Sequence, residues 1–69
     1  MKLLLSNIIV ANGIEQIVYP TLINNLEDIY EIARDGRDAN NRPIIRMDIT
    51  INDREHYTYT PSQLLALLS

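Results

Sequence analysis

The chain has 69 residues, no cysteine, one histidine and a formal net charge of −3 at pH 7. This length makes one domain, residues 1–69, and so short a chain hides only about 60% of its unfolded surface. The lack of cysteine excludes a disulfide framework and thiol chemistry, and the negative charge argues against a general nucleic-acid coat. We therefore expect good packing, or a partner chain, to supply the missing stability.

The dipeptide Asn12-Gly13 predicts a hairpin near the start of the chain. Both flanks are rich in β-branched residues, which favour strands, and Asn-Gly favours a two-residue type I′ turn. Such a turn places Val10 opposite Glu15 and Ile8 opposite Ile17. The first strand is apolar on both sides, which indicates a central position in the sheet.

The first residues also allow two other interpretations. One is a helix over residues 3–12 that ends at Gly13, because short apolar runs discriminate poorly between helix and strand. The other is a secretory signal after Lys2, but Ser6 and Asn7 interrupt its apolar run. No segment approaches the ~18 apolar residues of a membrane span. We expect a cytoplasmic protein with no membrane segment.

The segment after Pro20 predicts a helix with clear ends. Asn24 or Asn25 offers an N-cap, and Gly36 fits the left-handed position that follows a helix. Acidic residues fall in the first turn and Arg34 in the last, as the helix dipole favours. The apolar stripe at helical spacing comprises Leu26, Ile29, Tyr30, Ile32 and Ala33.

Apolar and polar residues alternate strictly over residues 45–51 and again over 56–60, which is typical of half-buried strands. A three-residue turn between them keeps both apolar sets on one face, whereas a two-residue turn separates them. We therefore expect Asn52 or Asp53 to adopt a left-handed or bulged conformation. The expected cross-strand pairs are Ile49 with Tyr57 and Met47 with Tyr59.

A short second helix is predicted at the end of the chain, with Thr60 as N-cap, Pro61 at the first helical position and Gln63 closing a capping box. So short a helix is unstable alone, so its leucines must dock. The predicted fold is α+β, with a small antiparallel sheet, the order β-β-α-β-β-α and both helices packed on one face. The other face would present Arg46, Asp48, Thr50, His56, Thr58 and Thr60.

This polar face and the surplus leucines predict a binding surface. Four leucines on a two-turn helix cover more than one side, and exposed apolar patches usually mark interfaces, although plain core filling is the alternative. We expect a small intracellular protein-interaction module: a regulator, adaptor or inhibitor that binds another protein or its own copy as a homodimer. The predicted interface residues are Leu64, Leu67, Leu68, Arg46, Asp48, Thr50, His56 and Thr58.

The arginines suggest an alternative function. Five of the six basic residues are arginines between positions 34 and 54. Arg37, Arg42 and Arg46 could form one patch that binds an anion or a nucleic acid, because guanidinium groups bind phosphates through paired hydrogen bonds. Acidic residues accompany most of the arginines, however, which favours a charge-balanced surface.

Catalytic and metal sites have weaker support. His56 with Asp48 is the one plausible catalytic pair, and a catalytic histidine needs a nucleophile or an orienting carboxylate within hydrogen-bond reach. We expect no enzyme, no catalytic residue and no cofactor. We expect no metal site either, because the carboxylates do not match the spacing of a calcium loop. These carboxylates are Asp35, Asp38, Asp48, Asp53 and Glu55.

Overall fold

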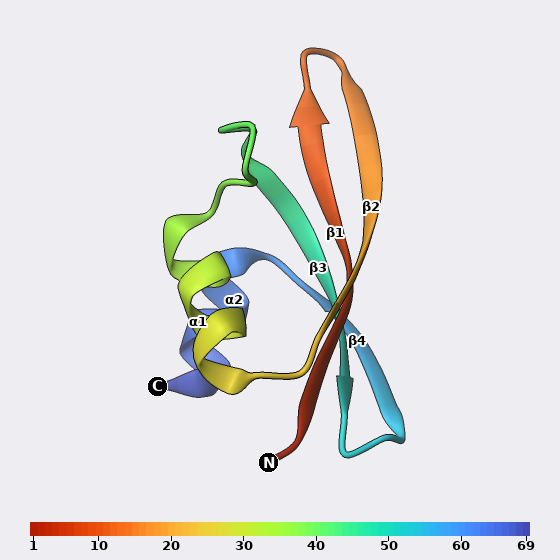
Figure 1. Ribbon diagram of the computed structural model, residues 1–69, viewed down its shortest axis with the longest axis vertical. Helices are drawn as coiled ribbons and strands as arrows, with labels where there is room; N and C mark the ends of the chain where they lie inside the picture. The colour runs from red at the N-terminus through yellow and green to blue at the C-terminus, as the bar shows by residue number, and fades with distance from the viewer.

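The computed structural model describes residues 1–69 and has an α+β fold, with a four-stranded antiparallel sheet and two helices. The strands occur in the sheet in the order β2-β1-β3-β4, so the first strand is internal. Figure 1 shows both helices on the same side of the sheet, with the other side uncovered. The elements in chain order are β1 (Leu3–Asn12), β2 (Glu15–Ile23), α1 (Leu26–Asp35), β3 (Ile44–Ile51), β4 (Glu55–Tyr59) and α2 (Pro61–Leu68).

The predicted α+β class and antiparallel sheet are confirmed, and the helical alternative for residues 3–12 is wrong because these residues form β1. The core is a single cluster of 11 buried apolar residues that joins the sheet to both helices. It comprises Leu3, Leu5, Ile8 and Val10 of β1, Ile29 and Ala33 of α1, Ile44, Met47, Ile49 and Ile51 of β3, and Leu64 of α2.

The turn between β1 and β2 consists of Gly13 and Ile14, one residue later than predicted. Gly13 has φ 64° and Ile14 has no positive φ, which suits a turn with glycine in the first central position. This register keeps the charge of Glu15 at the strand end and places apolar partners beside β1. The observed pairs are Asn12 with Glu15, Val10 with Ile17 and Ile8 with Tyr19, so the predicted pairs Val10–Glu15 and Ile8–Ile17 are wrong.

The turn between β3 and β4 has the predicted three-residue length. Asn52 (φ 52°) and Asp53 (φ 62°) are both left-handed, and the pairs Ile49–Tyr57 and Met47–Tyr59 form as expected. Tyr59 packs against the core. Tyr57 lies on the same side of the sheet, but its side chain is exposed because β4 is an edge strand.

The predicted helix ends are confirmed. Asn25, rather than Asn24, is the N-cap of α1, and its side-chain oxygen accepts a hydrogen bond from the backbone N–H of Asp28 at 3.1 Å. Gly36 ends α1 in the left-handed conformation with φ 67°. Thr60 and Gln63 form both hydrogen bonds of the capping box at the start of α2.

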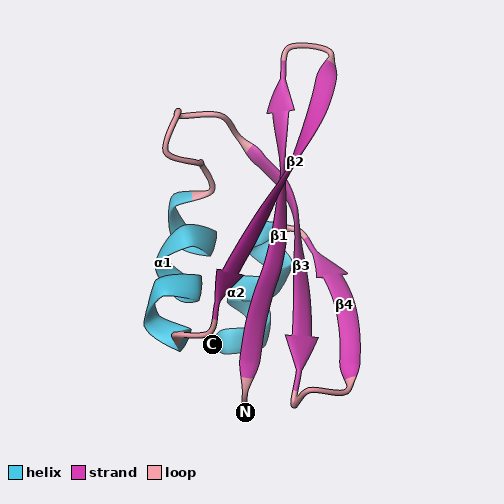
Figure 2. Cartoon of the chain, turned by 45° about the vertical axis from the view of Figure 1, so that its right-hand side comes forward, coloured by secondary structure: helices cyan, strands magenta, loops and turns pink.

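The β1–β2 hairpin extends beyond the rest of the sheet. Figure 2 shows its turn lying past the end of β3 and away from both helices. The last ladder partner of β1 on β3 is Ile44, which pairs with Val10, and one further hydrogen bond joins the Ala11 N–H to the Pro43 carbonyl at 2.9 Å. The hairpin tip is therefore a ribbon of two strands only.

Neither helix has the length and apolar character that crossing a membrane requires.

Candidate functional site

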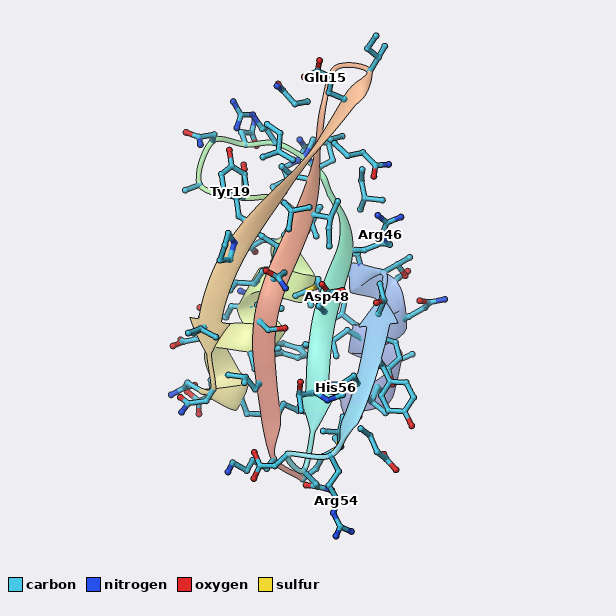
Figure 3. All side chains as sticks on the ribbon, turned by 90° about the vertical axis from the view of Figure 1, so that its right-hand side faces the viewer. Glu15, Tyr19, Arg46, Asp48, Arg54 and His56 are labelled. Carbon is cyan, nitrogen blue, oxygen red and sulfur yellow. The ribbon has the colours of Figure 1, made fainter.

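The side of the sheet that faces away from the helices, here called the open face, carries the predicted polar residues. Figure 3 views this face, with Arg46, Asp48 and His56 labelled and the helices behind the sheet. Asp48 pairs with Thr58, and Thr50 pairs with His56, at positions that alternate with buried Met47 and Ile49. The five predicted residues Arg46, Asp48, Thr50, His56 and Thr58 therefore lie on one face.

Asp48 is held by neutral hydrogen-bond donors from both neighbouring strands. Its Oδ1 accepts a hydrogen bond from the Thr58 hydroxyl at 3.0 Å, and its Oδ2 accepts one from the Asn7 side-chain amide at 3.3 Å. The Ser6 hydroxyl donates to its backbone carbonyl at 3.2 Å. No Lys, Arg or His lies within ion-pair distance of this half-buried carboxylate. The carboxylate is therefore fixed in position while its negative charge has no partner.

Thr50 and His56 form a second pair beside Asp48. The Thr50 hydroxyl and His56 Nδ1 lie 2.9 Å apart in a hydrogen bond. His56 thus bonds a threonine rather than Asp48, and the two residues considered for catalysis belong to separate pairs. A shallow recess of about 310 Å³ lies over this region, lined by Ser6, Asp48, Ile49, Thr50, His56, Tyr57 and Thr58.

Exposed apolar side chains occur on β2, at Val18 and Leu22, and in the turn before it, at Ile14, which sequence reasoning missed. Ile14, Val18 and Leu22, here called the β2 stripe, are 105%, 58% and 81% exposed. Val18 pairs with Ile9, and Ile9 pairs with Arg46 on the open face. Ile9 is 5% exposed although it lies outside the main core cluster. Ile17, Val18 and Tyr19 are consecutive apolar residues, so no apolar–polar alternation in the sequence signals this stripe.

The structure does not bring the three predicted anion-binding arginines into one patch. Arg42 Nη1 donates to the Tyr19 hydroxyl at 2.6 Å, and Tyr19 packs on the helix side of the sheet. Arg46 lies on the open face and donates to the Gln16 side chain at 3.3 Å. Arg37 donates to a backbone carbonyl of its own loop at 2.9 Å. The guanidinium groups of Arg42 and Arg46 thus form hydrogen bonds on opposite sides of the sheet.

The three predicted interface leucines of α2 have different environments. Leu64 is 0% exposed within the core cluster, so its side chain is not accessible to a partner. Leu64 is therefore a core residue and not an interface residue, contrary to the prediction. Leu68 packs against the core and lines a groove of about 330 Å³ beside Leu26 and Tyr30 of α1. Leu67 is 37% exposed. The intramolecular core therefore uses most of the leucines that seemed surplus in the sequence.

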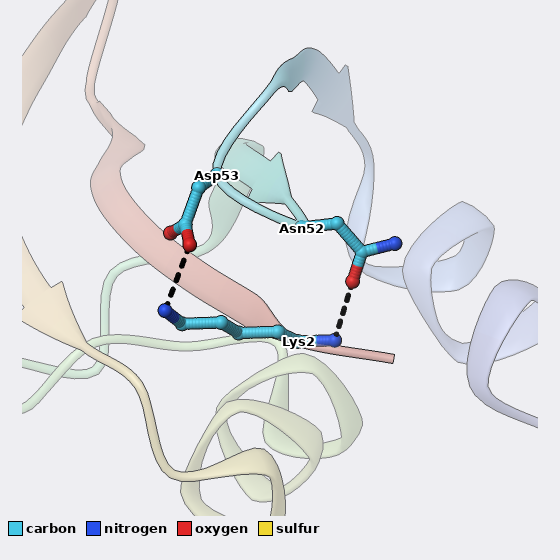
Figure 4. Close-up of polar contacts among 3 residues, drawn as sticks. All are labelled: Lys2, Asn52 and Asp53. Carbon is cyan, nitrogen blue, oxygen red and sulfur yellow. Dashed lines mark hydrogen bonds and ion pairs between the residues drawn. The ribbon is translucent and has the colours of Figure 1, made fainter.

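Polar contacts close the sheet at the end opposite the hairpin tip. The Lys2 backbone N–H donates to Asn52 Oδ1 at 3.0 Å, and Lys2 Nζ forms an ion pair with Asp53 Oδ2 at 2.8 Å (Figure 4). Asn52 N–H donates to the Lys2 carbonyl at 2.8 Å. These bonds fix the left-handed turn against the start of β1.

No three His, Cys, Asp or Glu side chains come together in an arrangement that could hold a metal ion. Comparison of the chain with protein-family models, with curated proteins and with solved structures finds no match. The helices leave the open face uncovered, and it carries the polar pairs described above.

Proposed function

We propose that this chain is a small protein-interaction module, acting as a regulator, adaptor or inhibitor, which self-associates and binds another protein through the polar half of its open face. The observation that carries the proposal is the Asp48 carboxylate, which two neutral donors fix on an uncovered sheet face without a cation. A half-buried charge that is held in place but unpaired favours a partner that supplies the opposite charge.

The chemistry of Asp48 defines the partner. A carboxylate has about four acceptor positions, so the hydrogen bonds from Thr58 and Asn7 leave acceptor capacity for an incoming donor. An arginine or lysine on the partner would form a charge-assisted hydrogen bond there, the stronger kind of hydrogen bond. The net charge of −3 also attracts a basic surface over a distance of about a Debye length.

The position of Asp48 in the sheet supports a recognition role. Asp48 and Thr50 lie on β3, an internal strand with ladder partners on both sides. Groups that are rigid before binding lose little conformational freedom when a partner docks, which favours affinity. Thr58 and His56 on β4 flank the carboxylate and add hydrogen-bonding groups around it.

The proposal includes no catalytic step and no cofactor, since His56 and Asp48 belong to separate hydrogen-bonded pairs. It places the protein in the cytoplasm, because a chain without cysteine suits a reducing compartment. Anion binding by Arg37, Arg42 and Arg46 is less well supported, because Arg42 and Arg46 form their hydrogen bonds on opposite sides of the sheet.

The test is affinity purification from cells of the source organism with the wild-type protein and with Asp48→Asn, followed by quantitative mass spectrometry. Asparagine keeps the size of the side chain and removes its charge. We expect one protein with a basic surface to be enriched by the wild type, and its affinity for Asp48→Asn to be about tenfold lower, which corresponds to about 1.4 kcal/mol. Binding should also weaken as salt concentration rises.

Glu31→Gln is the matched control, because it removes one negative charge from exposed α1 on the other side of the molecule. This variant should capture the partner as the wild type does. A partner that binds wild type and Asp48→Asn equally, or the absence of any partner, would contradict the proposal.

A further inference from the structure

We infer that the outer edge of β4 binds an extended basic segment of another protein, which adds a strand to the sheet and places a lysine or arginine at Asp48. This inference rests on the proposed function, in which Asp48 recruits a basic partner, and it names how that partner docks. It adds backbone hydrogen bonds along β4 to the charge contact, and the two contributions can be tested separately.

The hydrogen bonds of β3 show which backbone groups of β4 face outward. The Asp48 carbonyl accepts a hydrogen bond from Ser6 of β1, and the Asn52 N–H, four positions later, donates to the residue before β1. Because backbone direction alternates along a strand, Asp48 directs its backbone groups to β1 and not to β4. Its partner Thr58 therefore directs its own N–H and C=O away from β3. His56, two positions from Thr58, does the same.

These outward groups have no partner in the molecule. β4 is the last strand of the sheet, and none of the hydrogen bonds outside the regular elements involves the backbone of His56 or Thr58. Both residues are exposed. Thr60, the next residue of this set, uses its N–H and C=O at the start of α2. Two N–H groups and two carbonyls are therefore available to an added antiparallel strand, which would exchange a pair of hydrogen bonds with each residue.

The edge at β4 lacks the features that oppose strand addition. Exposed sheet edges are commonly protected by proline, by lysine or by bulges. The other edge strand, β2, contains Pro20, which has no N–H to donate to an added strand. β4 has no proline and no lysine, and its ladder with β3 runs without a register shift. The edge open to strand addition is therefore the one beside Asp48.

Asp48 determines the charge of the segment. A residue of the added strand opposite Thr58 has its side chain on the open face, two strand spacings of about 4.8 Å from Asp48. Lysine and arginine have stems of three or four methylene groups, which span this distance across the small Thr58 side chain. The recess of about 310 Å³ that Asp48 and Thr58 line gives the cation room beside the carboxylate.

The following residue of the segment meets a different surface. It lies opposite Tyr57, on the helix side of the sheet, where the Tyr57 side chain is 43% exposed. The rings of Tyr57 and Tyr59 lie side by side, with 5.7 Å between their centroids. Aromatic residues form favourable cross-strand pairs with β-branched and aromatic residues. The segment that fits this edge therefore alternates basic and apolar residues.

The charge of β4 favours another protein over a second copy of this chain. β4 carries Glu55 and no lysine or arginine. Two β4 strands paired edge to edge would bring further negative charge to a chain whose net charge is already −3. A basic segment instead supplies the cation that Asp48 lacks within its own chain.

The probe is a capped nine-residue peptide that alternates arginine and valine, compared with two N-methylated forms. With the arginines on the open face, the arginine N–H groups point to β4 and the valine N–H groups point away. Methylation of the arginine backbone nitrogens therefore removes hydrogen bonds to β4, and methylation of the valine nitrogens is the matched control. Calorimetric titration should show binding at least about tenfold weaker for the arginine-methylated form, and unchanged binding for the valine-methylated form.

Amide hydrogen exchange measured by NMR locates the contact. In the free protein, the amides of His56 and Thr58 should exchange faster than the amide of Tyr57, which faces β3. Saturating peptide should slow exchange at His56 and Thr58 by at least about tenfold and change Tyr57 little. Asp48→Asn should weaken peptide binding by about tenfold, whereas Glu31→Gln on α1 should bind the peptide like the wild type.

Equal binding of the two methylated peptides, or unchanged exchange at His56 and Thr58, would overturn strand addition. If Asp48→Asn still weakens binding in that case, the proposed function stands and the partner docks on the open face alone.

Sensitivity to arginine methylation without any effect of Asp48→Asn would overturn the role of Asp48 in both proposals. A peptide that does not bind at about 1 mM would overturn the inference, while capture of a basic partner from cells would still support the proposed function. A wild type that dimerises without peptide and protects His56 and Thr58 from exchange would assign the edge to a second copy instead.

Discussion

The guanidinium group of Arg42 donates a hydrogen bond to the hydroxyl group of Tyr19, with 2.6 Å between Nη1 and Oη. This contact joins the loop after α1 to the edge strand β2 on the helix side of the sheet. The same loop is ordered by Asp38, whose Oδ1 accepts hydrogen bonds from the backbone N–H groups of Asn40 and Arg42. Arg42 is thus fixed through both its backbone and its side chain.

Tyr19→Phe should lower the free energy of unfolding by about 1 kcal/mol, because it removes one hydrogen bond to a partly buried charged group. Urea denaturation followed by circular dichroism measures the change. Tyr30→Phe is the control, since Tyr30 is exposed on α1 and its hydroxyl makes no hydrogen bond within the chain. Equal losses for the two variants would show that the Arg42 contact contributes nothing.

Leu64→Ala should lower the free energy of unfolding by about 2–5 kcal/mol, because it leaves a cavity among fully buried side chains of β3 and α1. Leu67→Ala makes the same truncation on the exposed side of α2 and should change it by about 0.5 kcal/mol or less. Thermal or urea unfolding distinguishes the two. A larger effect at Leu67 would contradict the assignment of Leu64 to the core.

Gly13→Ala should lower the free energy of unfolding by about 1 kcal/mol, since φ is 64° there and an added Cβ would touch no other atom. The loss therefore comes from backbone conformation alone. Asn12→Ala should have little effect, because Asn12 belongs to β1 and has no positive φ. A large effect at Asn12 would instead support a turn centred on Asn12 and Gly13.

The pKa of Tyr57 is raised above its usual value of 10.0, chiefly because the negative charge of Glu55 opposes formation of the phenolate. The phenol also donates a hydrogen bond to Glu55 Oε2 at 3.3 Å. Because the pKa of Tyr57 is higher in the folded state than in the unfolded state, the protonated phenol contributes to the stability of the fold. This contribution is complete below pH 10.0 and is lost as pH rises through the raised pKa.

Glu55→Gln should therefore lower the pKa of Tyr57 toward 10.0. An NMR titration of the Tyr57 ring resonances measures it. Glu31→Gln, a distant acidic substitution on α1, should leave the titration unchanged. An unchanged pKa in Glu55→Gln would show that Glu55 does not perturb Tyr57 in solution.

The sequence allowed accurate predictions where local signals and burial agreed. Asn25, Gly36 and the capping box of Thr60 each satisfy backbone groups within one turn of the chain, so no distant contact decides them. The register of β3 and β4 was also predictable, because a shift by one residue would turn Met47 and Ile49 away from the helices.

The position of the β1–β2 turn and the exposed side of β2 depend on long-range strand pairing, so local sequence signals did not predict them. Gly13 can occupy either central position of a two-residue turn, and only the apolar partners of β1 select the first position. The β2 stripe was missed because β2 carries apolar residues on both of its sides. Val18 points outward, and Ile17 and Tyr19 point toward the core. The pattern of β2 does not indicate which of its sides the helices cover. The sequence therefore predicted the polar residues of the open face on β3 and β4, but not the exposed apolar residues of β2.

The internal position of β1 has a consequence for how the chain folds. Its hairpin with β2 closes across two residues, whereas Lys2, the residue before β1, contacts Asn52 of the β3–β4 turn, 50 positions away. Ribbons closed by tight turns form within microseconds, while contacts of such high sequence separation slow the search for the native topology. During synthesis, β1 can therefore pair only with β2 until β3 has left the ribosome.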